Sequence, residues 1–248
     1  MRAALILLGV VFLATVLVRL PPRALLWALP PDVACESPGG TVWSGTCGEV
    51  RVDAVTLQGL SWRLHPGALL HLRLAADLSS DDPAATGHAQ VELSRGGEVS
   101  IAALAAQIAL PGRVGLVGPG TSGTLQLDID SARISGGHLA ALQGRSVLQQ
   151  LRLANPPADL GSFELLFAPP VAEAQLPGAA VAMLGQLRDL NGPLSVTGVL
   201  RLSPDGSYEL AGSVAPKADA DPELARVLQL LGTPDAQGRR AFSIAGTM

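Results

Sequence analysis

The chain has 248 residues and a formal net charge of −4, and only 15% of its residues are charged and 3% aromatic. The negative charge, without any cluster of lysine or arginine, gives no electrostatic reason to expect a nucleic-acid partner. Hydrophobic residues make up 48% of the chain, which is enough to bury a large core of leucine, valine and alanine.

The chain opens with an uncharged run from Ala3 to Val18, flanked by Arg2 and Arg19. A helix rises about 1.5 Å per residue, so residues 3–20 would span about 27 Å, close to a bilayer core of roughly 30 Å. The alternative is a cleaved signal peptide, but no convincing small-residue cleavage site follows the run. We therefore expect an uncleaved single-pass membrane anchor in residues 1–23.

The segment behind the anchor is expected to lie outside the cytoplasm. Arg2 favours a cytoplasmic start, whereas Arg19 and Arg23 oppose it, but long domains cross a membrane largely regardless of charge. Residues 24–38 form the expected juxtamembrane linker, in which Trp27 suits a membrane interface. Residues 39–248 form the expected β domain.

The two cysteines of the chain, Cys35 and Cys47, lie at the start of this domain. In an oxidising compartment an even cysteine count favours a disulfide, and this one would close a short loop. Two buried free thiols are the alternative. No cysteine or histidine lies at a zinc-ligand spacing from either, so a metal site is not expected.

Alternation of apolar and polar residues predicts strands and hairpins through most of the chain. The strongest pattern is Thr124–Asp130, with Ala132–Ser135 expected as its neighbour across a tight corner. Ser203–Gly206 has proline and glycine where a type I turn places them, which predicts a hairpin between residues 194–202 and 207–214. The other predicted strands are residues 50–57, 60–64, 69–74, 89–93, 99–101, 163–167 and 241–248.

Helices are few. Pro222–Leu231 begins with proline and is followed by Gly232, as helix ends commonly are. Its apolar residues share one face, which we expect to be buried against the sheet: Leu224, Val227, Leu228 and Leu231. A shorter helix is expected at His138–Leu142. The fold class is therefore mainly β, with an antiparallel, strongly curved sheet and one or two short helices.

Candidate chemical sites are weak. Gly118–Gly123 matches the dinucleotide-binding pattern G-x-G-x-x-G, but a strand follows it and not a helix, so we interpret it as a loop. Asp128 and Asp130 share a strand face and could hold a cation or act as a catalytic pair, although simple alternation favours a solvated face. Ser44 and Ser122 lack the nucleophile-elbow pattern. The histidines are scattered: His65, His71, His88 and His138.

From these residues we predict no catalytic site, no metal and no cofactor, and hence no enzyme. A periplasmic hydrolase would need a nucleophile and a base, and no residues support that alternative.

The residues Gly40-Thr41-Val42-Trp43-Ser44-Gly45 resemble the type II secretion system protein N family. Leu60-Ser61-Trp62, followed by Pro66, agrees with the order of later landmarks, and the middle of the chain, residues 81–181, resembles the family only in the rhythm of its strands. The residues that carry the resemblance are Gly40, Val42, Trp43, Gly45, Trp62, Pro66, Gly206, Tyr208, Gly212, Gly232, Gly238, Arg239 and Gly246.

The resemblance implies a non-enzymatic accessory subunit, anchored in the bacterial inner membrane with its body in the periplasm. Its implied partners are other inner-membrane secretion subunits and the outer-membrane secretin. The alternative is an AsmA-like protein, in which a curved sheet forms a groove or open barrel and holds or transfers lipid. A core poor in aromatics and rich in leucine, valine and alanine suits such a groove as well.

Overall fold

The computed structural model describes residues 19–23, 33–52, 55–110, 120–154, 157–168, 183–218 and 220–247. The expected anchor run 3–18, Trp27 of the expected linker and Gly118–Pro119 lie outside these residues. No helix in the described part of the chain is long and apolar enough to cross a membrane.

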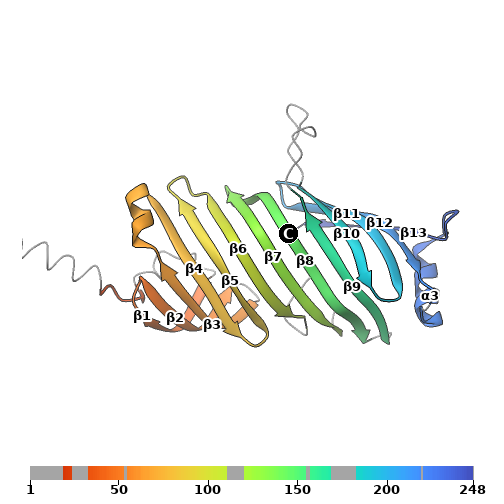
Figure 1. The fold of residues 1–248 in the computed structure, drawn as a ribbon, viewed down its shortest axis with the longest axis horizontal. Helices are drawn as coiled ribbons and strands as arrows, with labels where there is room; N and C mark the ends of the chain where they lie inside the picture. The colour runs from red at the N-terminus through yellow and green to blue at the C-terminus, as the bar shows by residue number, and fades with distance from the viewer. Residues whose placement is uncertain are drawn as a thin grey trace, which may run out of the picture. The chain divides into compact units, whose positions relative to one another are not determined.

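The described residues form thirteen strands and two short helical stretches (Figure 1). The strands follow one another in chain order across an antiparallel sheet, so β1 and β13 each have one strand neighbour among the described residues. The elements are β1 (Val33–Gly40), β2 (Ser44–Val52), β3 (Val55–Leu64), η1 (Pro66–His71), β4 (Arg73–Asp82), β5 (Ala85–Ser94), β6 (Val99–Ala109), β7 (Thr121–Ser135), β8 (His138–Ala154), β9 (Pro157–Phe167), β10 (Met183–Asn191), β11 (Leu194–Leu202), β12 (Ser207–Pro216), α3 (Pro222–Leu228), η3 (Gln229–Leu231) and β13 (Arg240–Thr247).

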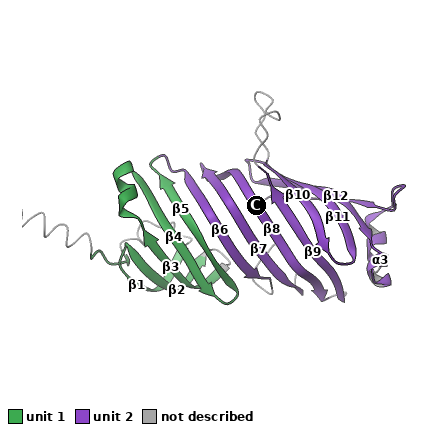
Figure 2. Cartoon of the chain, in the orientation of Figure 1, with its two compact units in different colours: residues 1–95 green, residues 96–248 purple. Residues whose placement is uncertain are grey.

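The mainly β class is thus confirmed. The chain divides into two compact units, residues 1–95 with β1 to β5 and residues 96–248 with β6 to β13 (Figure 2). Strand β1 begins at Val33, inside the expected linker 24–38.

In the first unit, the expected single strand at residues 50–57 is wrong. Strand β2 ends at Val52 and β3 begins at Val55, and these two valines face each other across a hairpin. Residues 60–64 are the second half of β3. The alternation of apolar residues continues across the turn, because both strands of the hairpin have their apolar residues on the same face, so the sequence pattern does not show the break.

The expected strand at residues 69–74 is also wrong over its first part, which forms the 3₁₀ helix η1. Pro66 lies in the first turn of η1, where its fixed φ suits a helical start and its missing N–H costs nothing. Strand β4 begins only at Arg73.

In the second unit, two expectations near Ser135 are wrong. Residues 132–135 do not form a separate neighbour but continue β7, and residues 138–142 are the start of β8 and not a helix. Gly136 and Gly137 have φ angles of 59° and 81° and connect Ser135 to its partner His138. A two-residue turn of this kind requires positive φ at both positions and produces a hairpin, which decides against the helix.

The predicted hairpin after residue 194 is confirmed: β11 and β12 pair from Leu194 opposite Pro216 to Leu202 opposite Tyr208. In its turn the Gly206 N–H donates to Ser203 O over 3.0 Å. Asp205 accepts hydrogen bonds from the side chain and the backbone N–H of Ser207, and these lower the pKa of its carboxyl. The strands expected near residues 89–93, 99–101, 163–167 and 241–248 are present as β5, β6, β9 and β13.

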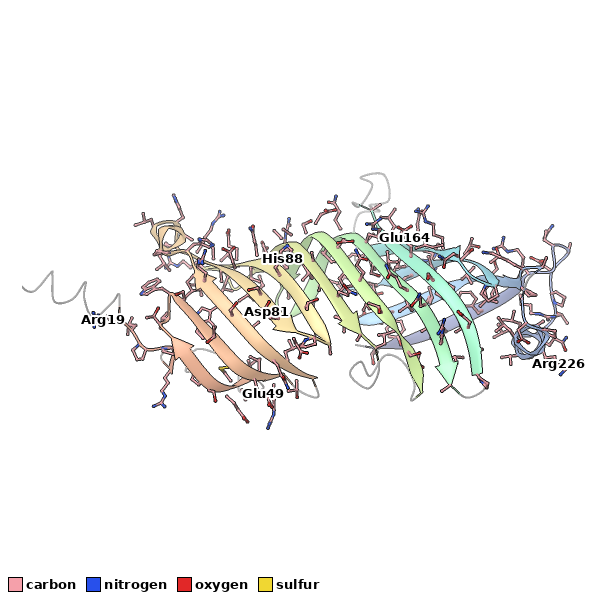
Figure 3. The ribbon with its side chains drawn as sticks, turned by 60° about the horizontal axis from the view of Figure 1, so that its bottom comes forward. Arg19, Glu49, Asp81, His88, Glu164 and Arg226 are labelled. Carbon is pink, nitrogen blue, oxygen red and sulfur yellow. A yellow bond between two sulfur atoms is a disulfide. The ribbon has the colours of Figure 1, made fainter. Side chains whose placement is uncertain are left out.

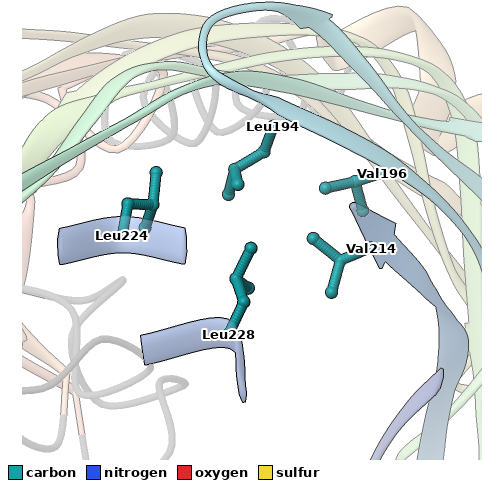
Figure 4. Packing of buried hydrophobic residues seen from close by; sticks show 5 residues of the cluster. All are labelled: Leu194, Val196, Val214, Leu224 and Leu228. Atoms are coloured by element: carbon teal, nitrogen blue, oxygen red, sulfur yellow. The ribbon is translucent and has the colours of Figure 1, made fainter. Parts of the chain in front are cut away.

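Helix α3 contributes two leucines to the main core of the second unit (Figure 4). Leu224 and Leu228 are buried against Leu194, Val196 and Val214 of β11 and β12, which confirms half of the expected apolar face. The other half is wrong, because Val227 is 42% and Leu231 46% exposed. The α-helix has only seven residues and changes to 3₁₀ geometry at Gln229, which alters the face that later residues present.

Candidate interaction surfaces

The corner between β1 and β2 is held by several hydrogen bonds. The Thr41 N–H donates to Ser44 O over 2.8 Å, and the Ser44 N–H returns a bond to the Thr41 hydroxyl over 3.2 Å. The Trp62 indole Nε1–H donates to Val42 O over 2.9 Å. The Val42 N–H donates to Leu20 O over 3.0 Å, so the chain before the sheet is attached to this corner.

Several of the residues that carry the family resemblance are aromatic rings packed over glycines on the neighbouring strand. A Cβ atom on Gly45 would lie 2.4 Å from the ring of Trp62, and one on Gly246 would lie 2.7 Å from the hydroxyl of Tyr208. Cross-strand glycines leave room for such rings to cover the adjacent backbone. The directly opposed pairs are Gly45 and Trp62, Phe167 and Gly185, Tyr208 and Gly246, and Gly212 and Phe242.

The disulfide between Cys35 and Cys47 joins β1 to β2 in the same unit. Cys47 is 1% exposed and packs with Val50, Trp62 and Leu64. The bridge therefore forms part of the core beneath the corner.

A ladder of charged side chains crosses four strands of the second unit. Arg145 of β8 contacts Asp128 of β7 over 3.3 Å and Glu164 of β9 over 3.7 Å, and Arg188 of β10 contacts Glu164 from the other side. The side chain of Glu164, labelled in Figure 3, is only 5% exposed. A buried carboxylate needs such partners, so the ladder fixes the register of β7 to β10.

Asp189 of β10 forms a second polar contact, which is half-buried. Its carboxylate accepts hydrogen bonds from the Lys217 ammonium over 2.7 Å and from the Val196 N–H over 2.8 Å. Burial alone would raise the pKa of Asp189, but these bonds and the charge of Lys217 together outweigh it and lower the pKa below 3.8. The contact links β10, β11 and the chain that leaves β12.

The outer side of β13 presents backbone groups that no described strand pairs with. The Lys217 N–H bonds Pro193 O, just beyond the paired ends of β11 and β12. Because hydrogen-bonded pairs alternate along an antiparallel ladder, the backbone groups of the odd-numbered residues of β12 point to β11 and those of the even-numbered residues point to β13. The even-numbered residues of β13 therefore bond β12, because they lie opposite even-numbered partners. The outward backbone groups belong to Ala241, Ser243, Ala245 and Thr247.

Two clefts lined by described residues adjoin these surfaces. One of about 480 Å³ borders the β1–β2 corner, and its hydroxyls Ser61 and Ser79 bond each other over 2.7 Å. One of about 580 Å³ lies in the second unit beside Leu224, where Arg152 pairs with Asp159 over 3.4 Å. The polar side chains named for each cleft are thus engaged with one another.

The candidate chemical residues lie apart. Asp128 belongs to the charged ladder, whereas Asp130 is exposed at a register shift between Ile129 and Ser131. His65 bonds Asp77 over 2.8 Å. Within the described residues no three metal-ligating side chains come together. The other candidates stand on separate elements: Ser44 starts β2, Ser122 lies on β7, His71 ends η1, His88 lies on β5 and His138 starts β8.

The sequence interpretation missed Glu164, Arg188 and Asp189, which form the strongest polar contacts of the second unit. Glu164 interrupts the apolar run Phe163–Phe167, and a charge inside a buried strand is a signal that a partner is needed. The partner itself comes from the register of β9 and β10, which one strand's pattern does not contain.

An open antiparallel sheet, with paired charges and packed glycines in its described residues, defines a mainly β protein. The family model of type II secretion system (T2SS), protein N, matches residues 31–243, and the chain belongs to this family. This confirms the resemblance drawn from the sequence.

Two relatives carry the same name, type II secretion system protein N. The protein of Vibrio cholerae is 27% identical over 98% of this chain and 97% of its own length. The protein of Aeromonas hydrophila is 28% identical over 93% of this chain and 92% of its own. No solved structure matches the chain.

Proposed function

We propose that the protein is a non-enzymatic subunit of the type II secretion machinery, held in the inner membrane by residues 1–23 with residues 39–248 in the periplasm. Membership of the protein N family supports the secretion role. The Cys35–Cys47 disulfide supports an oxidising compartment, since such bonds are rare in the cytosol. Intact mass of the membrane-extracted protein tests the anchor, because a mature start near residue 25 would remove it.

Strand β13 is the surface through which this subunit contacts its partners, and its open edge is the observation that carries the proposal. Residues 241–247 contain no charge and no proline, and Ile244 is 54% exposed. A partner strand can add to such an edge through backbone hydrogen bonds, while alternate side chains give specificity. The partners are other inner-membrane secretion subunits or the outer-membrane secretin.

The alternation of β13 provides a matched pair of variants. Ser243→Pro removes an outward N–H and leaves the bonds to β12, so folding should be nearly unchanged. Ile244→Pro removes a bond to β12 and should destabilise by about 1–3 kcal/mol, because the carbonyl of β12 loses its partner. We expect Ser243→Pro to abolish secretion and copurification of secretion subunits at an unchanged unfolding temperature. A Ser243→Pro protein that secretes and copurifies normally would show that β13 is not the contact.

A lipid-binding groove is the second candidate, and the apolar face of the second unit favours it. Directly opposed residues on neighbouring strands share a face, and one such row is half-buried: Ile108, Leu125, Leu148 and Phe163. Phe163 also packs against the cluster of Leu224 and Leu228, so this is the face that α3 partly covers. Photo-crosslinking of the full chain with acyl-labelled phospholipid should mark β6 to β9 if lipid lies there, and should leave them unmarked if not.

A further inference from the structure

The connection between β3 and β4 carries a leucine cluster that the proposed function does not use. Leu69, Leu70 and Leu72 are 42%, 85% and 61% exposed, and Leu70 is the most exposed of the large hydrophobic side chains recorded in the described residues. None of the residues of η1 is buried. Scattered surface leucines are ordinary, but three within four residues on one projection form a patch.

The backbone of Leu72 gives a second, independent observation. Its φ of 57° and ψ of 38° lie in the left-handed region, where glycine or asparagine is preferred and a bulky side chain is unusual. Its N–H ends η1 by bonding Leu69 O over 3.0 Å, a role that glycine fills at lower conformational cost. A leucine at this position is therefore unfavourable for the turn itself, which points to a use for its exposed side chain.

The leucine cluster lies at the same end of the first unit as the entry of the chain from the apolar run. Leu20 O accepts the Val42 N–H, and Trp43 O accepts the Leu64 N–H over 2.7 Å, one residue before His65 and η1. The eighteen residues before Arg19 contain the uncharged run 3–18. The end of the sheet that carries η1 therefore faces the membrane if that run crosses it.

We propose that η1 is a second membrane contact, in which Leu69, Leu70 and Leu72 enter the boundary between headgroups and acyl chains of the bilayer that residues 1–20 cross. The inference rests on the proposed anchor. A bilayer fits this patch better than a protein partner, because leucine is under-represented among residues that dominate protein interfaces, whereas membrane partition depends on apolar area. Arg63, His65 and His71 beside the cluster suit the headgroup layer.

Depth measurements on the full chain test the contact. Leu70→Cys, and in a second variant Pro83→Cys, are labelled with an environment-sensitive fluorophore in vesicles of phosphatidylethanolamine and phosphatidylglycerol. Pro83 is exposed and lies between β4 and β5, at the opposite end of the first unit. The native cysteines are joined in the disulfide and do not react.

We expect the label at residue 70 to shift to the blue and to be quenched by lipid-borne nitroxide, and the label at residue 83 to do neither. Before labelling, the introduced thiol of the Leu70→Cys variant should react with a charged maleimide at least about tenfold more slowly than that of the Pro83→Cys variant. Leu69 and Leu72 remain in this variant, and burial of one leucine side chain favours the buried state by such a factor.

Three results would overturn the inference, and the first two separate its failure from that of the anchor. If the protein floats with the vesicles but residue 70 stays accessible to water, the anchor stands and the contact is wrong. If the protein does not float, the anchor fails and the contact fails with it. A label at residue 70 that is shielded equally without lipid shows a protein contact, which also contradicts the proposal.

Discussion

The two edge strands of the sheet, β1 and β13, differ in how well their outward backbone groups are protected against pairing with another strand. The Thr41 N–H bonds Ser44 O, so the odd-numbered residues of β1 bond β2 and the backbone groups of its even-numbered residues point outward. One of these even-numbered residues is Pro38, which has no N–H to offer a partner strand. Ser37 has a φ of 56°, which breaks the flat course of the strand. Glu36 adds an exposed charge. Each of these features discourages pairing with another strand.

Strand β13 carries none of these features between residues 241 and 247. Its outward position 243 holds serine where β1 holds Pro38, and its alternate residues Phe242 and Ile244 are apolar. An unprotected edge of this kind is an aggregation hazard in an isolated protein. The same chain protects β1 with three features, so the contrast supports β13 as an edge that is kept for a partner.

The largest expected effect is a loss of stability when the core packed against β11 and β12, the strands next to the open edge β13, is disrupted. Leu228→Asp would place an unpaired carboxylate among Leu194, Val196 and Val214, beneath the last strands of the sheet. We expect a loss of about 3–5 kcal/mol in the free energy of unfolding, together with loss of secretion. Chemical denaturation of the purified full chain measures it.

The control for this variant is Val227→Asp, one residue away on the exposed side of α3. It should change stability by less than about 0.5 kcal/mol. Equal losses in the two variants would mean that α3 does not hold the core as its packing indicates.

The next largest effect concerns the protected edge. Replacing Cys35 and Cys47 together by serine removes a bridge with a sequence separation of 12, which by loop entropy contributes about 3 kcal/mol. We expect lower stability but normal secretion below the new unfolding temperature, because β1 is not the contact edge. Loss of secretion by a still folded double variant would reverse the assignment of the two edges.

Local sequence patterns predicted a strand correctly where the residues of that strand and its turn determine the structure by themselves. The hairpin of β11 and β12 was predicted because Pro204 and Gly206 specify its turn and both arms alternate. The helix expected at residues 138–142 failed because its residues suit either structure, and the turn at Gly136–Gly137 decides between them. The signal for the turn was present in the sequence as these two consecutive glycines.

The interaction surfaces were harder to predict because they depend on register. The ladder exists because of the register of three strands, which places Arg188 directly opposite Glu164 and Arg145 diagonally across from it. Whether β13 is an edge, and which of its backbone groups point outward, follows from the strand order and from one hydrogen bond at Lys217. The apolar periodicity of one segment predicts neither the edge position of β13 nor the direction of its backbone groups.

A smaller effect concerns the polar contact between β10 and the end of β12. Asp189→Asn removes the charge that Lys217 pairs with and should cost about 1–3 kcal/mol at pH 7. The folded-state pKa of Asp189 is lowered, so its stabilisation is present above the unfolded value of 3.8 and is lost as pH falls through the folded pKa. The difference between the two proteins in denaturation midpoint should therefore shrink below about pH 4. A difference that stays constant down to about pH 2 would contradict the ion pair.

The smallest expected effect addresses the edge comparison itself. Pro38→Ser gives β1 the outward N–H that Ser243 provides in β13, but Ser37 and the disulfide still hold the strand away from a flat course. We expect the purified protein to stay within about 0.5 kcal/mol of the parent in stability, with an unchanged elution volume on gel filtration and unchanged secretion. New dimers would show that the proline alone closes this edge. The Ser243→Pro variant of β13 relies on the same effect, in which proline at one outward position removes the N–H that a partner strand would bind.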